Sequence, residues 1–231
     1  MLSVIPNPPR VALPIVGGDD LFPVRRVYCV GRNYAAHARE MGKDPDREPP
    51  FFFMKPADAL QPCGAEPTAH PYPPQSENYH FEIEMVAALG RGGHDIPVGT
   101  ALEHVYGYAI GLDMTRRDLQ DEAKRLARPW DLAKAADRSG PIGPIHPAGR
   151  IGHPARGPIV LCVDGAERQR GDLAEMIWSI PEQIAYLSAY FELQPGDLIF
   201  TGTPSGVGPV RRGERMVAAI EGLGAIALDV V

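Results

Sequence analysis

Short hydrophobic stretches separated by turn residues recur along the chain, and they predict a strand-rich fold. The clearest, "HFEIEMVAALG" at 80–90, sets two glutamates within an otherwise apolar segment. Alternate side chains of a strand point to one face, so Glu82 and Glu84 share the face that continues with Val86. Further single strands are predicted in 27–30, 51–56 and 104–113, and another in 196–210, where it runs into a Gly-rich loop. A pair of strands is predicted in 216–231, and a hairpin in 159–170 that turns at Asp164-Gly165.

Three segments predict helices: 35–42, 115–127 and 179–193. Thr115 is positioned to cap the second helix, with Asp118 three residues later. In the third helix, Ser179 and Glu182 have capping-box spacing. Its apolar stripe is formed by Ile184, Leu187 and Phe191. The pattern as a whole predicts a mixed α+β class in which strands outnumber helices.

Proline-rich segments suggest where the chain divides. Residues 1–24 predict an irregular arm with one short strand, and 63–78 form a second proline-rich crossing. We therefore expect a small N-terminal domain over 1–75 and a main domain over 76–231. The length of 231 residues fits one large domain or one domain with a smaller annex.

The glutamate pair at 80–90 raises a chemical question, because an ionised carboxylate is costly to bury without a partner or a metal. Asp113 ends the next predicted strand and supplies a third carboxylate. Three oxygen ligands without nearby nitrogen or sulfur favour a hard cation such as Mg²⁺, Mn²⁺ or Ca²⁺. The alternative is that Glu82 and Glu84 face solvent on a half-exposed strand.

Other residues are candidates for chemistry. His37 and Glu40 are neighbours at i, i+3 on the first predicted helix, which suits a general-base pair or an exposed surface contact. Lys134 stands among apolar residues, where it is either solvated or a counter-charge to an anionic ligand. Thr203 lies in the Gly-rich "TGTPSGVG" loop, which is either an anion-binding loop or a plain turn.

Composition excludes several classes of protein. The formal charge is −6, so there is no basic footprint for nucleic acid. The three cysteines are far apart and indicate neither a disulfide framework nor a zinc site. No hydrophobic run reaches the ~20 residues of a membrane span, and the N-terminus lacks a signal-peptide pattern. We expect a cytoplasmic protein.

Seven stretches together resemble the fumarylacetoacetate hydrolase superfamily. They occur in the family's order and cover most of the chain from Val27 onward: "VYCVGRNYAAHAREMG", "FFFMKPADAL", "HFEIEMVAALG", "YAIGLDMTRRDLQ", "WDLAKAAD", "MIWSIPEQIAYLS" and "GDLIFTGTPSGVGP". The resemblance implies a β-roll main domain, a small N-terminal domain with a lid helix, and a homodimer. It also implies a small anionic diketo-acid substrate and no nucleic-acid or membrane partner.

The resemblance further implies roles for individual residues. Mg²⁺ or Mn²⁺ would be held by Glu82, Glu84 and Asp113. The catalytic residues would be His37, Glu40 and Lys134, and the substrate-binding residues would be Arg117, Gln120 and Thr203.

The implied reaction is hydrolysis of a carbon–carbon bond in a 2,4-diketo acid. The substrate class is the acylpyruvates, with fumarylpyruvate from aromatic (gentisate) degradation as the first choice, giving fumarate and pyruvate. Water deprotonated by His37 and Glu40 would attack the C4 carbonyl, and the metal would stabilise the negative charge that develops on the C2 oxygen. Two alternatives stay within the superfamily, oxaloacetate decarboxylation and diene-dioate isomerisation. An alternative of another class is a non-catalytic, metal-dependent binding protein.

Overall fold

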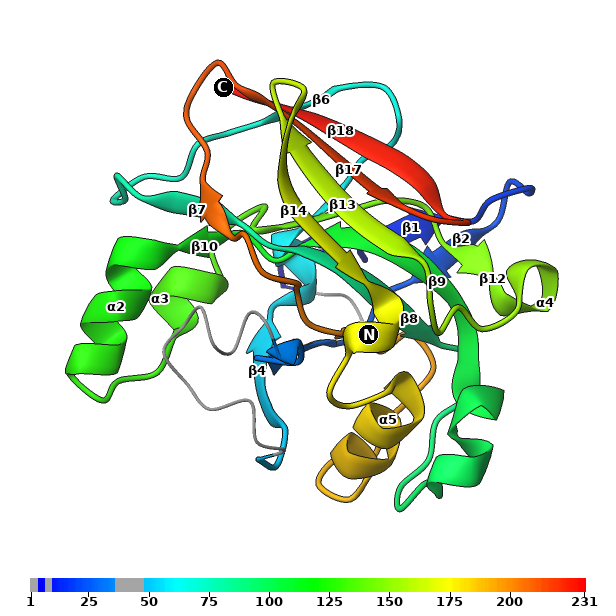
Figure 1. Ribbon diagram of the computed structural model, residues 1–231. Helices are drawn as coiled ribbons and strands as arrows, with labels where there is room; N and C mark the ends of the chain where they lie inside the picture. Colours follow the sequence, from blue (N-terminus) through cyan, green and yellow to red (C-terminus); the bar gives the residue numbers. More distant parts are fainter. Residues whose placement is uncertain (1–3, 7–9, 36–47) are drawn as a thin grey trace.

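A mixed sheet of eight strands forms the centre of the protein (Figure 1). The computed structural model describes residues 4–6, 10–35 and 48–231. The strands of this sheet are β3 (Val27–Gly31), β4 (Phe51–Lys55), β5 (Leu60–Pro62), β8 (Ile83–Leu89), β9 (Val105–Leu112), β11 (Gly140–Ile142), β12 (His146–Pro147) and β15 (Leu198–Phe200). They follow the order β4-β3-β15-β8-β9-β11-β5, with β12 also paired to β9. The long hairpin of β8 and β9 therefore lies in the middle of the sheet.

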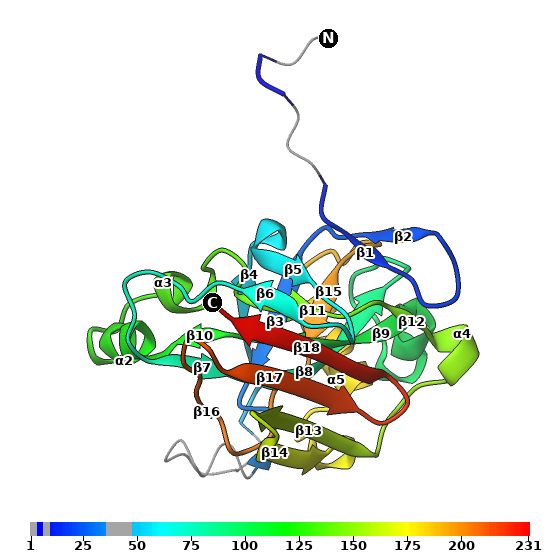
Figure 2. The same ribbon diagram turned by 90° about the horizontal axis from the view of Figure 1, so that it is seen from above.

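A second sheet, of five strands, packs over the central one (Figures 1 and 2). Its order is β14-β13-β17-β18-β6, and the strands are β6 (Thr68–His70), β13 (Pro158–Val163), β14 (Ala166–Asp172), β17 (Arg215–Ile220) and β18 (Gly224–Val230). The hydrophobic core between the sheets joins Met85 and Ile110 of the central sheet to Leu161 and Leu228 of the second. The two sheets are thus held face to face by apolar packing.

Two small sheets account for the remaining strands of the described residues. One contains β7 (Tyr79–Phe81), β10 (Thr115–Arg116) and β16 (Gly208–Pro209), and the other contains β1 (Ala12–Pro14) and β2 (Leu21–Pro23). The N-terminal arm therefore has two short strands, where the sequence predicted one. The hairpin between β13 and β14 turns as predicted, with positive φ at Asp164 (49°) and Gly165 (78°), as a type I′ turn requires.

The helices are short and lie at the margins of the sheets (Figure 1). Among the described residues they are α2 (Arg117–Arg125), α3 (Asp131–Lys134), α4 (Ala148–Ile151) and α5 (Ile180–Ser188), with 3₁₀ turns η1 (Ala57–Ala59), η2 (Val98–His104) and η3 (Leu173–Glu175). The strand-dominated α+β class is therefore confirmed. The helix predicted at 35–42 lies outside the described residues, apart from its first residue.

The start of α5 is as predicted, whereas the start of α2 is not. The Ser179 N–H donates to the Glu182 carboxylate at 2.9 Å, as in a capping box. The helix ends at Ser188, so Phe191 lies beyond it and is 38% exposed. Thr115 does not cap α2. It belongs to β10, and its buried hydroxyl donates to the Asp113 carbonyl at 3.0 Å, because strand pairing with β7 takes precedence over the local capping pattern.

The predicted boundary near residue 75 falls between β6 and β7. Strands from before it, β3, β4 and β5, share the central sheet with strands from after it. Division into domains at 1–75 and 76–231 stays a prediction.

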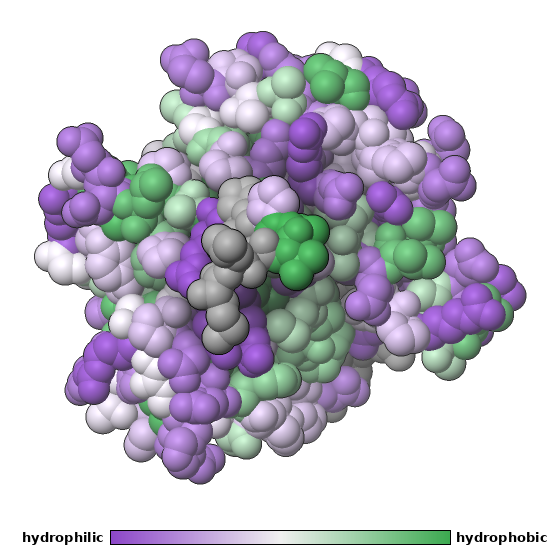
Figure 3. Space-filling view, turned by 180° about the vertical axis from the view of Figure 1, so that it is seen from behind, coloured by the Kyte–Doolittle hydropathy of each residue, from purple (hydrophilic) through white to green (hydrophobic). Residues whose placement is uncertain are grey.

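Hydrophilic residues cover much of the face shown in Figure 3, with smaller hydrophobic patches among them. Within the described part of the chain, no helix combines the length and apolar character needed to cross a bilayer.

Candidate metal centre and pocket

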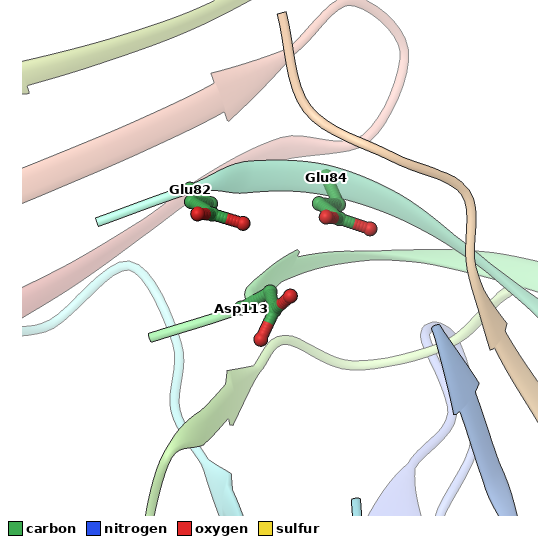
Figure 4. Close-up of side chains that lie close together, drawn as sticks. All are labelled: Glu82, Glu84 and Asp113. Carbon is green, nitrogen blue, oxygen red and sulfur yellow. The ribbon is translucent and has the colours of Figure 1, made fainter. Parts of the chain in front are cut away.

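The three predicted metal ligands come from the hairpin at the centre of the sheet. Glu82 fills the one-residue break between β7 and β8, Glu84 lies in β8, and Asp113 directly follows β9. The Asp113 N–H donates to the Glu82 carbonyl at 2.8 Å, which sets these two residues opposite each other on antiparallel strands. Opposite residues, and residues two apart, share a face, so the carboxylates converge (Figure 4). One oxygen from each lies within 4.8 Å of the others.

Burial of these carboxylates rules out a half-exposed strand. Glu82 is 5% exposed, and Glu84 and Asp113 are each 1% exposed. β8 is flanked by β15 and β9 in its own sheet, and all of its residues are buried. Carboxylates at this depth require compensating positive charge.

Three cationic side chains supply part of that charge. Lys134 Nζ lies 2.8 Å from Glu82 Oε2 and 2.7 Å from Asp113 Oδ2. Arg117 donates to Glu82 Oε1, and Lys55 Nζ lies 2.9 Å from Asp113 Oδ1. Lys134 is 2% exposed, so the solvated-lysine alternative does not apply to it. Its action on a substrate stays a prediction.

Glu84 is the least compensated of the three. Burial raises its pKa well above the usual value, and the negative charges of Asp113 and Glu82 raise that pKa further. The Gly202 N–H acts in the opposite direction, donating to Glu84 Oε2 at 2.7 Å. Gly202 has φ of +99°, and a Cβ there would lie 2.5 Å from Asn33 Cβ, so this close backbone approach requires glycine.

Lys134 shows the complementary effect. Burial alone would lower the pKa of Lys134, but the negative charges of Asp113 and Glu82 together outweigh burial, and the pKa is raised. The ammonium group is therefore held in its charged form beside the carboxylates.

The donor set fits a divalent cation. All three groups offer carboxylate oxygen, the chemistry that Mg²⁺, Mn²⁺ and Ca²⁺ prefer. Asp113 Oδ1 is contacted by Lys55 Nζ at 2.9 Å and has no further donor among the described residues. A cation bound here would share this oxygen with Lys55 and relieve the carboxylate repulsion that adds to burial in raising the pKa of Glu84.

One pocket joins this centre to the residues that the resemblance assigns to substrate binding. It is lined by the three carboxylates together with Arg117, Gln120, Lys134 and Thr203. Arg117 Nη1 donates to Gln120 Oε1 at 2.5 Å, one turn apart on α2. Gln120 and Thr203 are each 3% exposed. The structure therefore gathers seven of the nine predicted site residues, and the other two, His37 and Glu40, lie outside the described residues.

His80 helps to position Arg117. Arg117 Nε donates to His80 Nδ1 at 3.4 Å, while His80 Nε2 lies 2.9 Å from Asn78 Oδ1. Burial, followed by the positive charge of Arg117, lowers the pKa of His80 to about 4. The imidazole is therefore neutral near pH 7 and accepts from the guanidinium.

Two supporting residues were missed from the sequence. Lys55 is 1% exposed at the end of β4, and a lysine closing an apolar strand was the available signal. Gln169 is fully buried in β14, where its Nε2 donates to Thr203 Oγ1 at 2.8 Å and its Oε1 accepts from the Ile83 N–H at 3.0 Å. The polar stretch around Gln169 gave no sign of burial. These contacts tie the Gly-rich loop to β8.

The chain is similar to known proteins in both sequence and structure. The sequence model described as "Fumarylacetoacetate (FAA) hydrolase C-terminal" matches residues 26–231. The crystal structure of fumarylpyruvate hydrolase from Pseudomonas aeruginosa, in complex with Mn²⁺ and pyruvate, is 60% identical, with a TM-score of 0.98 over 100% of this chain and 99% of that one. The mitochondrial oxaloacetate tautomerase FAHD1 of Arabidopsis thaliana is 39% identical over 89% of this chain and 90% of its own length.

A third relative is named as an isomerase rather than as a hydrolase or a tautomerase. The structure of 5-carboxymethyl-2-hydroxymuconate delta-isomerase from Mycobacterium smegmatis is 34% identical, with a TM-score of 0.79, and the match covers 96% of this chain and 82% of that one. Family match, full-length likeness and the observed strand-rich fold agree. The chain belongs to the fumarylacetoacetate hydrolase family.

Proposed function

We propose that this protein is a divalent-metal-dependent hydrolase that cleaves the carbon–carbon bond of an acylpyruvate, with fumarylpyruvate as the substrate. The observation that carries the proposal is the buried cluster of Glu82, Glu84 and Asp113 in one pocket with the cationic side chains of Arg117 and Lys134. The 60% identity to a fumarylpyruvate hydrolase that holds Mn²⁺ and pyruvate supports the choice of substrate.

In this proposal, Glu82, Glu84 and Asp113 hold Mg²⁺ or Mn²⁺. The bound cation supplies Lewis-acid stabilisation of the charge that develops on the pyruvyl oxygens. Lys134 and Arg117 lie beside these carboxylates and bind the anionic pyruvyl end of the substrate. Gln120 orients Arg117, and the Thr203 hydroxyl, fixed by Gln169, donates to the substrate carboxylate.

Hydrolysis additionally requires an activated water. We assign its deprotonation to His37, with Glu40 orienting the imidazole and raising its basicity. The two residues stand three apart in the sequence, which suits this pairing on a helix. A homodimeric assembly, a cytoplasmic location and a place in gentisate degradation stay predictions.

A second candidate function is tautomerisation of oxaloacetate. The 39% identity to an oxaloacetate tautomerase favours it, and oxaloacetate also offers a 2-oxo acid to the same pocket. The two activities differ in outcome, because hydrolysis of an acylpyruvate releases pyruvate, whereas tautomerisation only interconverts the enol and keto forms and breaks no carbon–carbon bond.

The test is pyruvate release from fumarylpyruvate and acetylpyruvate, beside enol-to-keto conversion of oxaloacetate followed by ultraviolet absorbance. We expect pyruvate release that is abolished by a chelator and restored by Mg²⁺ or Mn²⁺. Rapid conversion of oxaloacetate without pyruvate release from any acylpyruvate would favour the second candidate. Full hydrolysis in excess chelator would refute the metal requirement.

A further inference from the structure

The outer part of the pocket has a wall of three aromatic rings. Phe51 and Trp130 meet edge to face, with ring centroids 5.6 Å apart, and Phe53 lies 5.8 Å from Trp130. All three line the same pocket as the carboxylates or its continuation beyond Lys134. The wall extends the pocket from the metal centre toward solvent.

Each ring of this wall carries one cationic side chain. Lys134 Nζ lies 5.1 Å from the centre of the Phe53 ring. The Arg32 guanidinium lies 5.3 Å from the centre of Phe51, and Lys124 Nζ lies 5.8 Å from the centre of Trp130. Contact with an aromatic face restrains a cation without neutralising its charge. The wall therefore holds three positive charges along the pocket.

Exposure separates these cations into an inner one and two outer ones. The Lys134 side chain is 3% exposed and is bound to two carboxylates, whereas the Lys124 side chain is 29% exposed. Arg32 is likewise only half-buried. Arg32 and Lys124 thus mark the end of the pocket that lies away from the metal centre.

Arg32 is held in place by its backbone. It follows β3 with φ of +57°, a conformation that residues other than glycine adopt rarely. The next residue, Asn33, fixes this turn, because its side chain donates to the Thr201 and Trp178 carbonyls and accepts from the Trp178 N–H at 2.7 Å. These hydrogen bonds fix the backbone from which Arg32 extends, and its guanidinium lies against the Phe51 ring.

The outer cations have little compensating charge. Within the described part of the chain, no carboxylate forms an ion pair with Arg32, and Lys124 has one exposed partner, Asp121, at 3.3 Å. Burial lowers the pKa of Lys124; Asp121 acts in the opposite direction, and the positive charges of Arg117 and Arg32 add to the lowering. The outer end of the pocket thus has cations that repel each other.

Charge counting indicates what the pocket accepts. Among the described residues that line it, the four cationic side chains, Arg32, Arg117, Lys124 and Lys134, outnumber the three carboxylates. A divalent cation at the metal centre adds two further positive charges. The pyruvyl end of a substrate supplies a single carboxylate, so a substrate with one anionic group leaves the outer excess unbalanced.

We propose that Arg32, assisted by Lys124, forms an outer subsite that binds a second carboxylate at the far end of the substrate and so makes the protein selective for dicarboxylates. This inference rests on the proposed function and deepens it. The aromatic wall packs against the apolar carbons between the two carboxylates. Arg32 is then a specificity-determining residue that takes no part in bond cleavage.

The test measures binding, so that it does not depend on turnover. The Mn²⁺-loaded protein is titrated calorimetrically with 2-oxoheptanedioate, which has the chain length and both end carboxylates of fumarylpyruvate but lacks the cleavable diketone. The matched ligand, 2-oxoheptanoate, has a methyl group in place of the distal carboxylate. Wild type is compared with Arg32→Gln, Lys124→Gln and the control Arg125→Gln, an exposed cation on the same helix as Lys124.

We expect wild type to bind the dicarboxylate roughly tenfold to a hundredfold more tightly than the monocarboxylate, the range of a charge-assisted contact. Arg32→Gln should remove most of this preference while leaving the Kd of 2-oxoheptanoate within about twofold, since the pyruvyl end is bound elsewhere. Lys124→Gln should reduce the preference less, and Arg125→Gln should retain it.

Equal binding of both ligands by wild type, or a preference that survives in the Arg32→Gln, Lys124→Gln double variant, would overturn the proposal. So would an equal loss for both ligands, which would place Arg32 at the pyruvyl end. Failure of wild type to bind either ligand would also overturn it. Failure of the proposed function has a separate signature, the absence of pyruvate release from every acylpyruvate, whatever the ligand affinities.

Discussion

Replacing Lys134 with methionine tests whether the lysine and a metal ion compete for the same carboxylates. Lys134 Nζ forms hydrogen bonds with Glu82 and Asp113 and is almost fully buried. Removing one partner of a buried ion pair typically costs about 3–5 kcal/mol. Glu82 keeps Arg117 and Asp113 keeps Lys55, so we expect the lower end of that range, about 3 kcal/mol, for the metal-free protein.

A bound divalent cation changes this cost. It compensates the carboxylates directly, so the loss of unfolding free energy in the metal-loaded Lys134→Met protein should shrink to about 1 kcal/mol. The two losses and the two metal affinities form a thermodynamic cycle. A difference of about 2 kcal/mol between the losses therefore requires the variant to bind Mn²⁺ about thirtyfold more tightly.

The assay is urea unfolding of wild type and Lys134→Met in excess chelator and in saturating Mn²⁺, together with direct Mn²⁺ titration. Lys124→Met is the matched control, because its ion-pair partner is the exposed Asp121 and we expect changes below about 1 kcal/mol. The value of kcat/KM for fumarylpyruvate should fall strongly in Lys134→Met despite the tighter metal. An equal loss of stability with and without Mn²⁺, or weaker Mn²⁺ binding, would refute the competition between lysine and metal.

Two further predictions concern residues that support the pocket. Gln169→Met should lower the free energy of unfolding by about 2–4 kcal/mol, because the buried Ile83 N–H and Pro204 carbonyl lose their hydrogen-bond partner. Urea unfolding measures this difference, and a change below about 0.5 kcal/mol would contradict the prediction. Burial lowers the pKa of His70 to about 4, below its unfolded value near 6.5, so its stabilising effect is complete above pH 6.5 and is lost as the pH falls toward 4. Between pH 7 and pH 4, the free energy of unfolding should therefore fall by about 3 kcal/mol more in wild type than in His70→Gln. If the two proteins instead show parallel pH profiles of unfolding free energy, His70 has no such role.

The carboxylate centre could be predicted from sequence because its geometry is local. Glu82 and Glu84 are two apart near one end of a strand, and Asp113 ends the strand that pairs with it. Strand alternation and one hairpin are sufficient to bring such residues together. The same reasoning correctly gave the Asp164-Gly165 turn, since the turn type depends on adjacent residues alone.

Residues that depend on distant strand packing could not be found in this way. Lys55 reaches Asp113 from β4, and Gln169 reaches the Gly-rich loop from the second sheet. Neither contact follows from a periodicity, because each depends on how segments far apart in the chain pack. Thr115 shows the opposite case: its local sequence predicted a helix cap, but the residue pairs with β7 as part of a strand. Arg117 and Gln120 were identified by resemblance rather than by their own pattern.

The inner and outer cations of the pocket differ in what they can contribute to selectivity. Lys134 and Arg117 are already bound to carboxylates, so a substrate that recruits them must replace existing ion pairs and gains little net affinity. Arg32 has no carboxylate partner among the described residues, so an anion that reaches it forms a new contact at lower cost. Inner substitutions should therefore act mainly on kcat, and outer substitutions on the choice between ligands. Selectivity among ligands should therefore depend on Arg32, whose charge is uncompensated among the described residues, rather than on the inner cations that are already paired with carboxylates.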